Sequence, residues 1–274
     1  MVCHETYKDQ TNAWLSPDEV TSEDGKEFYK KDNPSEKIIV GPTESMSKSK
    51  RNTIDPENII KNYGADSVRL FILSDSPPEK DVQWSDQGMI ASFKFIQKLW
   101  TLNSKILGKI NDNNQDDEGE DLIKFTNKLT YKITHNLERF HYNVIIANLY
   151  EMYNFLIKES DKQIKKGVLI DNYKKLLILM NPIIPHFSNE CLSLLSEKKI
   201  NWPTVSKNDL IEEKINFVVQ INSKKKSILK LKRDITEKEV LEAIELNEET
   251  QKNLKDQKIK KIIFVPNRLI NIII

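Results

Sequence analysis

The sequence predicts a mainly α-helical protein with a small α+β part, and three features of the 274-residue chain indicate this. Apolar stripes with helical spacing recur between residues 89 and 197. After Pro203, two runs rich in β-formers, a capped helix and two more β-rich runs follow. The first 87 residues are polar and rich in turns. We therefore expect three domains, at 1–87, 88–205 and 206–274, of which the second is a helical bundle and the third a small α+β domain.

Composition restricts the class of protein. With 38% hydrophobic and 30% charged residues, the chain is typical of a soluble globular protein. The net charge of +1 means that a nucleic-acid surface would have to come from local clustering of cations. No apolar run reaches the roughly 18 residues that span a bilayer, and the start has no signal-peptide pattern. Two distant cysteines, Cys3 and Cys191, indicate a reducing, cytoplasmic location, and the lone Cys3-His4 pair is too little for a metal site.

The elements of the first domain surround a basic loop. Residues 38–42 read as a short strand that ends in a turn, and the loop SMSKSKRN follows at 45–52. Asp55 is a predicted N-cap, with Pro56 at the first helical position and Gly64 just past the helix end. A second short helix is expected at about 65–73. The segment 74–88 is expected to be mostly loop, because Pro77-Pro78 cannot continue a helix.

Five helices are expected in the second domain. The first begins at Met89, and the acidic stretch 111–121 after it reads as a solvated loop. The others are expected at 121–138, 141–160 and 168–181, and after Pro185. The expected core faces are Met89, Phe93, Ile96, Trp100 and Leu107 in the first helix, Leu122, Phe125, Leu129, Ile133 and Leu137 in the second, and Val144, Ala147, Tyr150, Tyr153 and Phe155 in the third.

The third domain is expected to have the order strand–strand–helix–strand–strand. Its strands are placed at 216–222 and 226–233 and in the two runs at the C-terminus, and its helix at 236–254 begins with a Thr236/Glu239 capping box. RLINIII is expected inside a sheet, because an unpaired strand of this composition would aggregate. Six cations lie within the ten residues 224–233, and from the residues alone this segment reads as a solvated hairpin.

The loop SMSKSKRN has two readings. It is either a basic surface loop or a site for a polyphosphate, since it follows a strand and precedes a helix N-terminus, where N–H groups, hydroxyls and ammonium groups favour an anion. Lys48 is a compact point charge suited to phosphate, and Ser47 and Ser49 add donors.

Several segments of the chain resemble the leucyl-tRNA synthetases, a family of class I aminoacyl-tRNA synthetases. SMSKS resembles the KMSKS loop of class I enzymes, and GADSVRLFILSDSPPEKDVQWSD at 64–86 resembles the stretch that follows it in leucyl-tRNA synthetases. MVCHETYKD and WLSPDEV resemble the part before the loop in bacterial members. ERFHYNVIIANLYEMYN and LLILMNPIIPHFSNE resemble the anticodon-binding domain, and IIFVPNRLINIII resembles the end of the C-terminal domain.

The resemblance implies a fold, an activity and site residues. It implies the end of a Rossmann-type catalytic domain with the KMSKS loop and stem helices, then a helical anticodon-binding domain and a C-terminal α+β domain that binds tRNA. The implied reaction joins leucine to ATP, with Mg²⁺, and passes leucine to tRNA(Leu). The ATP-binding loop would be Ser45, Met46, Ser47, Lys48 and Ser49, with Lys48 acting in the transition state. Phosphate or tRNA contacts are expected from Lys50, Arg51, Lys224, Lys225, Lys226, Lys230, Lys232 and Arg233.

Two departures from the family pattern matter. Ser45 stands where the pentapeptide has its first lysine, and none of the four histidines lies beside a glycine, so the His-x-Gly-His signature is absent. The chain therefore resembles a C-terminal third, either a fragment or a subunit that works with a separately encoded N-terminal part. A tRNA-binding module without catalysis is the alternative. Arg69, Asp81 and Trp84 are expected to be structural, and His186 is expected to be packed or to cap a helix.

Overall fold

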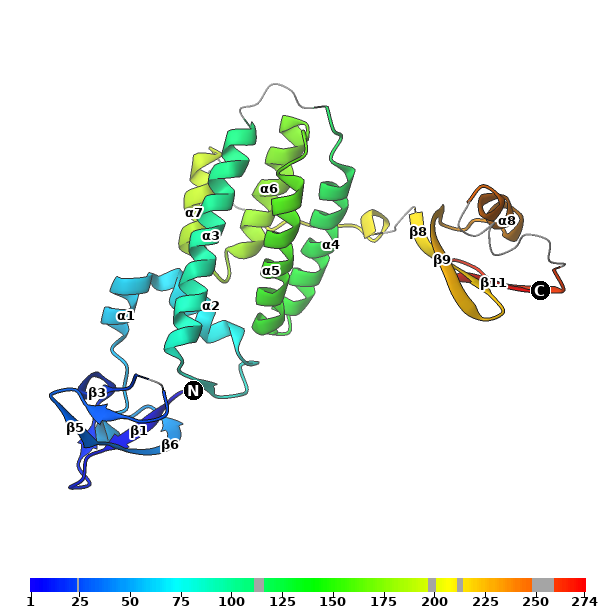
Figure 1. Cartoon of the computed structure of the whole chain (residues 1–274). Helices are drawn as coiled ribbons and strands as arrows, with labels where there is room; N and C mark the ends of the chain where they lie inside the picture. The colour runs from blue at the N-terminus through cyan, green and yellow to red at the C-terminus, as the bar shows by residue number, and fades with distance from the viewer. Residues whose placement is uncertain (24, 111–115, 197–200, 211–213, 248–258) are drawn as a thin grey trace. The chain divides into compact units, whose positions relative to one another are not determined.

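The computed structural model describes residues 1–23, 25–110, 116–196, 201–210, 214–247 and 259–274. The chain forms two compact units, residues 1–206 and residues 207–274 (Figure 1). Within the described residues, no helix is both long and apolar enough to cross a bilayer.

The first unit begins with two small sheets, where the sequence indicated little regular structure. One sheet has the order β2-β1-β6, with β7 parallel to β1, and the other has the order β3-β4-β5. The strands are β1 Val2–Lys8, β2 Trp14–Leu15, β3 Val20–Thr21, β4 Tyr29–Lys30, β5 Asn33–Lys37, β6 Ile39–Ser45 and β7 Val82–Gln83. Strand β7 lies in the segment expected to be mostly loop. Local sequence patterns did not predict these strands, because strand formation depends on pairing between distant segments. Strand β1 pairs with β6 across about 40 residues, with Cys3 opposite Ser45.

Two short helices form the stem between the sheets and the long helices: α1 Pro56–Tyr63 and α2 Ala65–Ser74. The Asp55 side chain accepts a 3.0 Å bond from the Glu57 N–H, so the predicted N-cap of α1 is confirmed. Gly64 separates the helices with φ of +79°, a conformation that glycine adopts without steric cost. The predicted structural role of Trp84 is also confirmed, because its ring packs edge-on against Phe71 at 5.2 Å.

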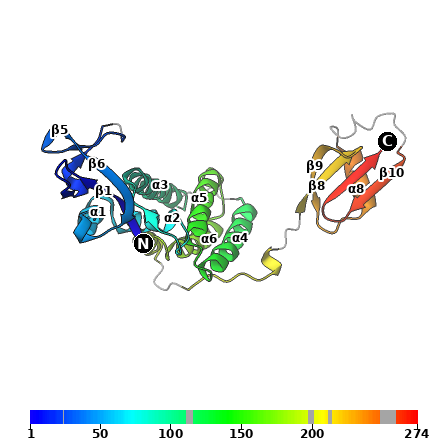
Figure 2. The ribbon, with the colours of Figure 1, turned by 90° about the horizontal axis from the view of Figure 1, so that it is seen from below.

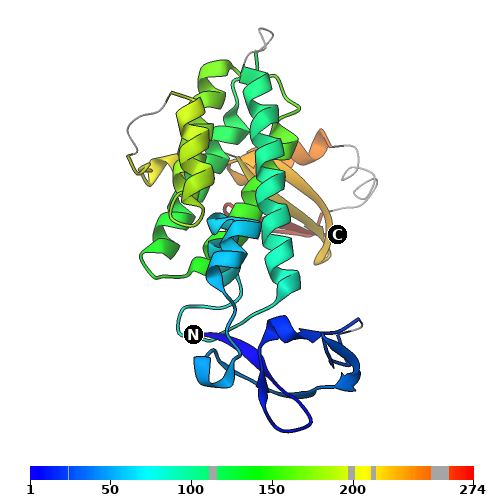
Figure 3. The same cartoon turned by 90° about the vertical axis from the view of Figure 1, so that its left-hand side faces the viewer.

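Five further helices run side by side in the described part of the first unit (Figures 1 and 3). They are α3 Asp86–Ile110, α4 Glu120–Leu137, α5 Tyr142–Glu159, α6 Lys166–Met180 and α7 Pro185–Leu194. The predicted five helices are therefore confirmed in number and order. A single apolar cluster runs through all of them, and Leu70 of α2 belongs to it, so the stem is packed into the core of the bundle.

The buried face of α3 agrees with the expected one only in part, and that of α5 differs from it. In α3 the predicted Met89 and Ile96 are buried, but Trp100 is 38% exposed; Phe95, Leu99 and Ile106, which were not predicted, are also buried. In α5, the predicted Val144 is 41% exposed; the buried positions are Ile145, Ile146, Leu149, Met152 and Leu156. Apolar side chains surround both helices, so spacing alone does not identify the face that neighbours cover. The predicted face of α4 was correct, with Leu122, Leu129 and Ile133 buried and Phe125 and Leu137 partly buried.

The acidic stretch after α3 was predicted to be a solvated loop. Its described residues 116–118 are exposed as expected, and hydrogen bonds and an ion pair also hold them to the protein. Residues 111–115 lie outside the described residues. Asp116 and Asp117 donate their N–H groups to the Gln163 carbonyl, at 3.1 and 2.9 Å. The carboxylate of Glu118 pairs with Lys165. The segment therefore packs against the connection between α5 and α6.

The second unit is a four-stranded sheet, order β10-β11-β8-β9, with one helix against it (Figure 2). Its elements are β8 Lys214–Ile221, β9 Lys224–Lys232, α8 Glu237–Glu245, β10 Lys261–Val265 and β11 Leu269–Ile273. The capping box of Thr236 and Glu239 is present as predicted. The helix ends at Glu245, earlier than expected, and residues 248–254 of the expected helix lie outside the described part. Strand β11 pairs on both sides, so RLINIII is inside the sheet as expected.

Candidate functional site

The basic loop begins on a strand. Ser45 is the last residue of β6 and pairs with Cys3 of β1, and the Met46 N–H donates to the Val2 carbonyl at 3.2 Å. A single 3-10 turn at Lys48–Lys50 follows, and Arg51 closes it with φ of 55°. The exposed loop is therefore shorter than the motif, because its first residue belongs to the sheet.

Asn52 anchors this loop, and no sequence argument assigned it a role. The residue is completely buried. Its side-chain oxygen accepts a 2.8 Å bond from the Ser47 N–H. Its side-chain nitrogen donates to the carbonyls of His4 and Glu44, both at 3.3 Å. One carboxamide thus connects the start of the loop to both strands of the β1–β6 pair. The only signal in the sequence is the asparagine that ends SMSKSKRN.

Lys48 is the exposed cation of the turn. The side chains beside it are hydroxyls, since Ser47 Oγ and Ser49 Oγ lie 3.3 Å apart. Among the residues that the structure describes, the Lys48 ammonium group has no hydrogen-bond or ion-pair partner, so it is free to meet a ligand. An ammonium group with hydroxyl donors next to it is suited to phosphate oxygens.

The next two cations of the loop are paired with carboxylates of the protein. Lys50 forms an ion pair with Glu44. Arg51 Nη2 lies 3.0 Å from Glu19 Oε1, and Arg51 Nη1 donates to the Trp14 carbonyl at 3.1 Å. The pKa of Glu19 is lowered, first by the N–H of Ser16 and then by Arg51. To bind a phosphate, Lys50 or Arg51 would first have to break its ion pair with a carboxylate. Lys48 has no such ion pair to break among the described residues.

A neighbouring cavity of about 330 Å³ does not include the loop. His4, Tyr7 and Phe28 contribute to its walls, together with the carboxylates of Asp18, Asp55 and Asp86. None of the residues from Ser45 to Arg51 lines it. Three carboxylates disfavour a polyphosphate, so this cavity is not suited to bind one. Within the described ranges, no three His, Cys, Asp or Glu side chains are grouped to hold a metal ion.

The basic hairpin β8–β9 directs cations to one face of its sheet. Lys226, Lys230 and Lys232 are exposed, and the residues between them, Ser227, Leu229 and Leu231, are buried or half-buried. The buried faces of the sheet and of α8 share one apolar cluster, including Phe217, Val240 and Ile270. Because side chains alternate along a strand, the lysines point away from α8. Lys224, Lys225 and Arg233 are exposed at the ends of β9.

Comparison with known proteins agrees with this geometry. Residues 6–85 match the model for tRNA synthetases class I (I, L, M and V). Residues 120–242 match the anticodon-binding domain of tRNA ligase. Over the whole length of this chain, the leucine–tRNA ligase of Orientia tsutsugamushi is 40% identical to it, and that of Wolbachia pipientis is 36% identical. Over its whole length, the chain is similar to leucyl-tRNA synthetases.

The chain corresponds to one part of these similar proteins. It spans about a third of the length of the curated relatives, 33% in both of those two ligases, and matches their C-terminal third. A solved LeuRS–tRNA–LeuAMS ternary complex from Agrobacterium radiobacter K84 is 26% identical, with a TM-score of 0.66. That match covers 83% of this chain and 31% of the solved one. The predicted combination of a class I synthetase segment and an anticodon-binding region is thus confirmed.

Proposed function

We propose that the chain supplies the KMSKS-like loop and the tRNA-binding domains of a leucine–tRNA ligase, which activates leucine with ATP and transfers it to tRNA(Leu). The observation that carries this proposal is the match of the entire chain to leucine–tRNA ligases, at 40% identity, with Lys48 exposed at the loop. The tRNA-binding module without catalysis is less favoured, because residues 6–85 match a class I synthetase model.

The loop would act on the activation step. As the leucine carboxylate attacks the α-phosphorus of ATP, negative charge grows on the departing pyrophosphate. A cation that is already in place stabilises this charge without reorganisation. Lys48 is the proposed cation, and Ser45, Met46, Ser47 and Ser49 shape the loop around it. Lys50 and Arg51 are secondary candidates for phosphate or tRNA contacts, since ion pairs with Glu44 and Glu19 hold them.

The remaining assignments follow from the family. We propose that residues 1–87 complete a Rossmann-type catalytic domain, that 88–205 dock tRNA, and that 206–274 contact it through the hairpin cations. Leucine and most of the ATP site would come from the N-terminal part, on the same chain or on a separate subunit. Mg²⁺ would accompany ATP, and no ligand for it is assigned among the described residues. The proposed location is the cytoplasm.

Exchange of pyrophosphate into ATP tests the proposed reaction. The 274-residue chain alone should show no leucine-dependent exchange, because it lacks the His-x-Gly-His signature. Joined to the N-terminal two-thirds of the Orientia tsutsugamushi relative, it should support both exchange and charging of tRNA(Leu). The matched control is the N-terminal portion without this chain, which should be inactive. Exchange by the 274-residue chain alone, or an inactive joined enzyme that is folded, would contradict the proposal.

The salt dependence of tRNA binding tests the hairpin. Changing Lys224, Lys225 and Lys226 together to alanine should flatten the plot of log affinity against log salt by roughly 2–3 units, because each lost phosphate contact removes nearly one unit. The matched control is a triple change of acidic residues, Asp116, Asp117 and Glu118 to alanine, which should not weaken binding. Equal slopes for the wild type and the lysine variant would mean that the hairpin is only solvated.

A further inference from the structure

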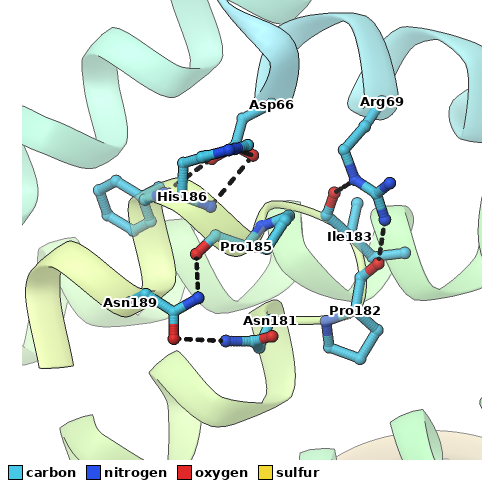
Figure 4. A network of polar contacts seen from close by, with 9 residues as sticks. Asp66, Arg69, Asn181, Pro182, Ile183, Pro185, His186 and Asn189 are labelled. Carbon is cyan, nitrogen blue, oxygen red and sulfur yellow. Dashed lines mark hydrogen bonds and ion pairs between the residues drawn. The ribbon is translucent and has the colours of Figure 1, made fainter.

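Helix α2 carries two opposite charges that both reach the turn between α6 and α7. Asp66 and Arg69 are three residues apart, so they lie on the same face of the helix. Their partners lie more than a hundred residues further along the chain (Figure 4). The Asp66 side chain was not identified from the sequence, whereas a structural role was expected for Arg69.

Asp66 caps α7 from another helix. The N-cap position of α7 is Ile184, which has no side-chain acceptor, and Pro185 is the first helical residue. Asp66 Oδ2 accepts from the Phe187 N–H at 2.7 Å, and Oδ1 accepts from the His186 N–H at 3.2 Å. The ring Nδ1 of His186 lies 2.9 Å from Oδ1. Asp66 is only 7% exposed, and its charge lies at the positive end of the α7 dipole.

Arg69 satisfies the carbonyl groups of the same turn. Its Nε donates to the Ile183 carbonyl at 2.9 Å, and its Nη2 donates to the Pro182 carbonyl at 2.8 Å. The planar guanidinium can serve two acceptors at fixed angles. The turn is also braced internally, since Asn181 donates to Asn189 at 3.2 Å and Asn189 donates to the Pro185 carbonyl at 2.8 Å (Figure 4). Both charged groups on α2 therefore bind a turn that also has hydrogen bonds of its own.

The hydrogen bonds of Asp66 and Arg69 fix the direction of α2, which apolar packing alone does not. Leu70 of α2 is fully buried in the bundle core, and burial alone favours contact without fixing direction. Five hydrogen-bonded contacts with set geometry fix where α2 lies along the α6–α7 turn. At its other end the stem continues into the loop, which Asn52 ties to the sheet. The stem is therefore held at the bundle by α2 and at the loop by Asn52.

We infer that Asp66 and Arg69 are positioning residues that set the orientation of the stem, and with it the loop that carries Lys48, relative to the helical bundle. The catalytic part of this inference rests on the proposed function. We call the contacts of Asp66 and Arg69 with the α6–α7 turn the clamp. If tRNA docks on the bundle, the clamp keeps the docked tRNA in a fixed position relative to the loop. Transfer to tRNA depends on that register, and activation of leucine does not.

The mechanical part is tested on the 274-residue chain with two spin labels. One is placed on the stem through Lys61→Cys and one on α6 through Lys175→Cys; both positions are exposed, and the native Cys3 and Cys191 are buried. The intact clamp should give one narrow distance distribution. Asp66→Ala and Arg69→Ala should each broaden or shift it, and the double variant should add little, because both break one unit. The control Arg139→Ala, an exposed arginine, should leave it unchanged. An unchanged distribution in the Asp66 and Arg69 variants would overturn the inference.

The catalytic part is tested in the enzyme joined to the relative's N-terminal two-thirds. Arg69→Ala should lower kcat for charging, at saturating tRNA, by about tenfold or more, because small misplacements of reacting groups are costly. Pyrophosphate exchange should stay within about twofold, and Arg69→Lys should restore part of the charging rate. Equal loss of both reactions would mean that the clamp only supports folding and would overturn the coupling. If the joined wild-type enzyme catalysed neither reaction, the proposed function itself would be refuted. The spin-label distances would still test the positioning role of Asp66 and Arg69.

Discussion

Replacing Lys48 with alanine should lower kcat for leucine activation about 100-fold or more in the joined enzyme. The physical reason is that Lys48 is the loop cation without a protein partner among the described residues, so its full charge is available to the departing pyrophosphate. Because that charge develops in the transition state, the KM for ATP should change much less than kcat. Pyrophosphate exchange measured against ATP concentration separates the two parameters.

Three companion variants make this test specific. Lys61→Ala removes an exposed cation from α1 and should leave kcat unchanged. Lys48→Arg keeps the charge and should retain part of the rate. Ser45→Lys restores the family's first lysine and should leave activity equal or raise it, although Ser45 lies at the end of β6. A Lys48→Ala enzyme with unchanged kcat would remove Lys48 from the mechanism.

Replacing Asn52 with alanine should displace the loop and lower kcat for activation, also by about 100-fold, since a shift of about 1 Å can cost that much. The change removes the acceptor of the Ser47 N–H and one donor to each of the carbonyls of His4 and Glu44, which are opposite each other in the β1–β6 pair. Buried polar groups that lose a partner cost about 1–3 kcal/mol, so the free energy of unfolding should fall by a similar amount. Denaturant titration and pyrophosphate exchange measure the two effects.

Two further variants separate an effect of Asn52 on the loop from an effect on the stability of the whole protein. Asn58→Ala, at an exposed asparagine on α1, is the matched control and should change neither quantity. Asn52→Asp keeps an acceptor for the Ser47 N–H but places a carboxylate oxygen against two carbonyls, so it should not rescue the loop. If Asn52→Ala lowered stability but left kcat unchanged, Asn52 would hold the sheet only.

Local signals in the sequence were sufficient for much of the chain. The N-cap at Asp55, the Thr236/Glu239 capping box and the helix that starts at Pro185 were each predicted within a few residues. Each depends on a side chain and a backbone group that are close together along the chain. The resemblance to leucyl-tRNA synthetases was also evident, because it rests on motifs in order along the whole chain and needs no knowledge of contacts.

Long-range pairing was less predictable. Strand β1 forms by pairing with β6, and the buried faces of α3 and α5 depend on which helices surround them. In both helices apolar residues occur on more than one side, so a periodic pattern fits more than one face. Spacing therefore predicted that helices form and only in part how they pack.

The sequence by itself determined the order of the helices, the resemblance to leucyl-tRNA synthetases and the choice of Lys48 as the cation to test. Only the tertiary structure decided that Lys50 and Arg51 are paired with carboxylates, that Asn52 anchors the loop, and that Asp66 and Arg69 clamp α2 to the turn before α7. The reason is physical. A side chain's charge and size are local properties, but its partner is set by chain segments that folding brings together, here from up to 121 residues away.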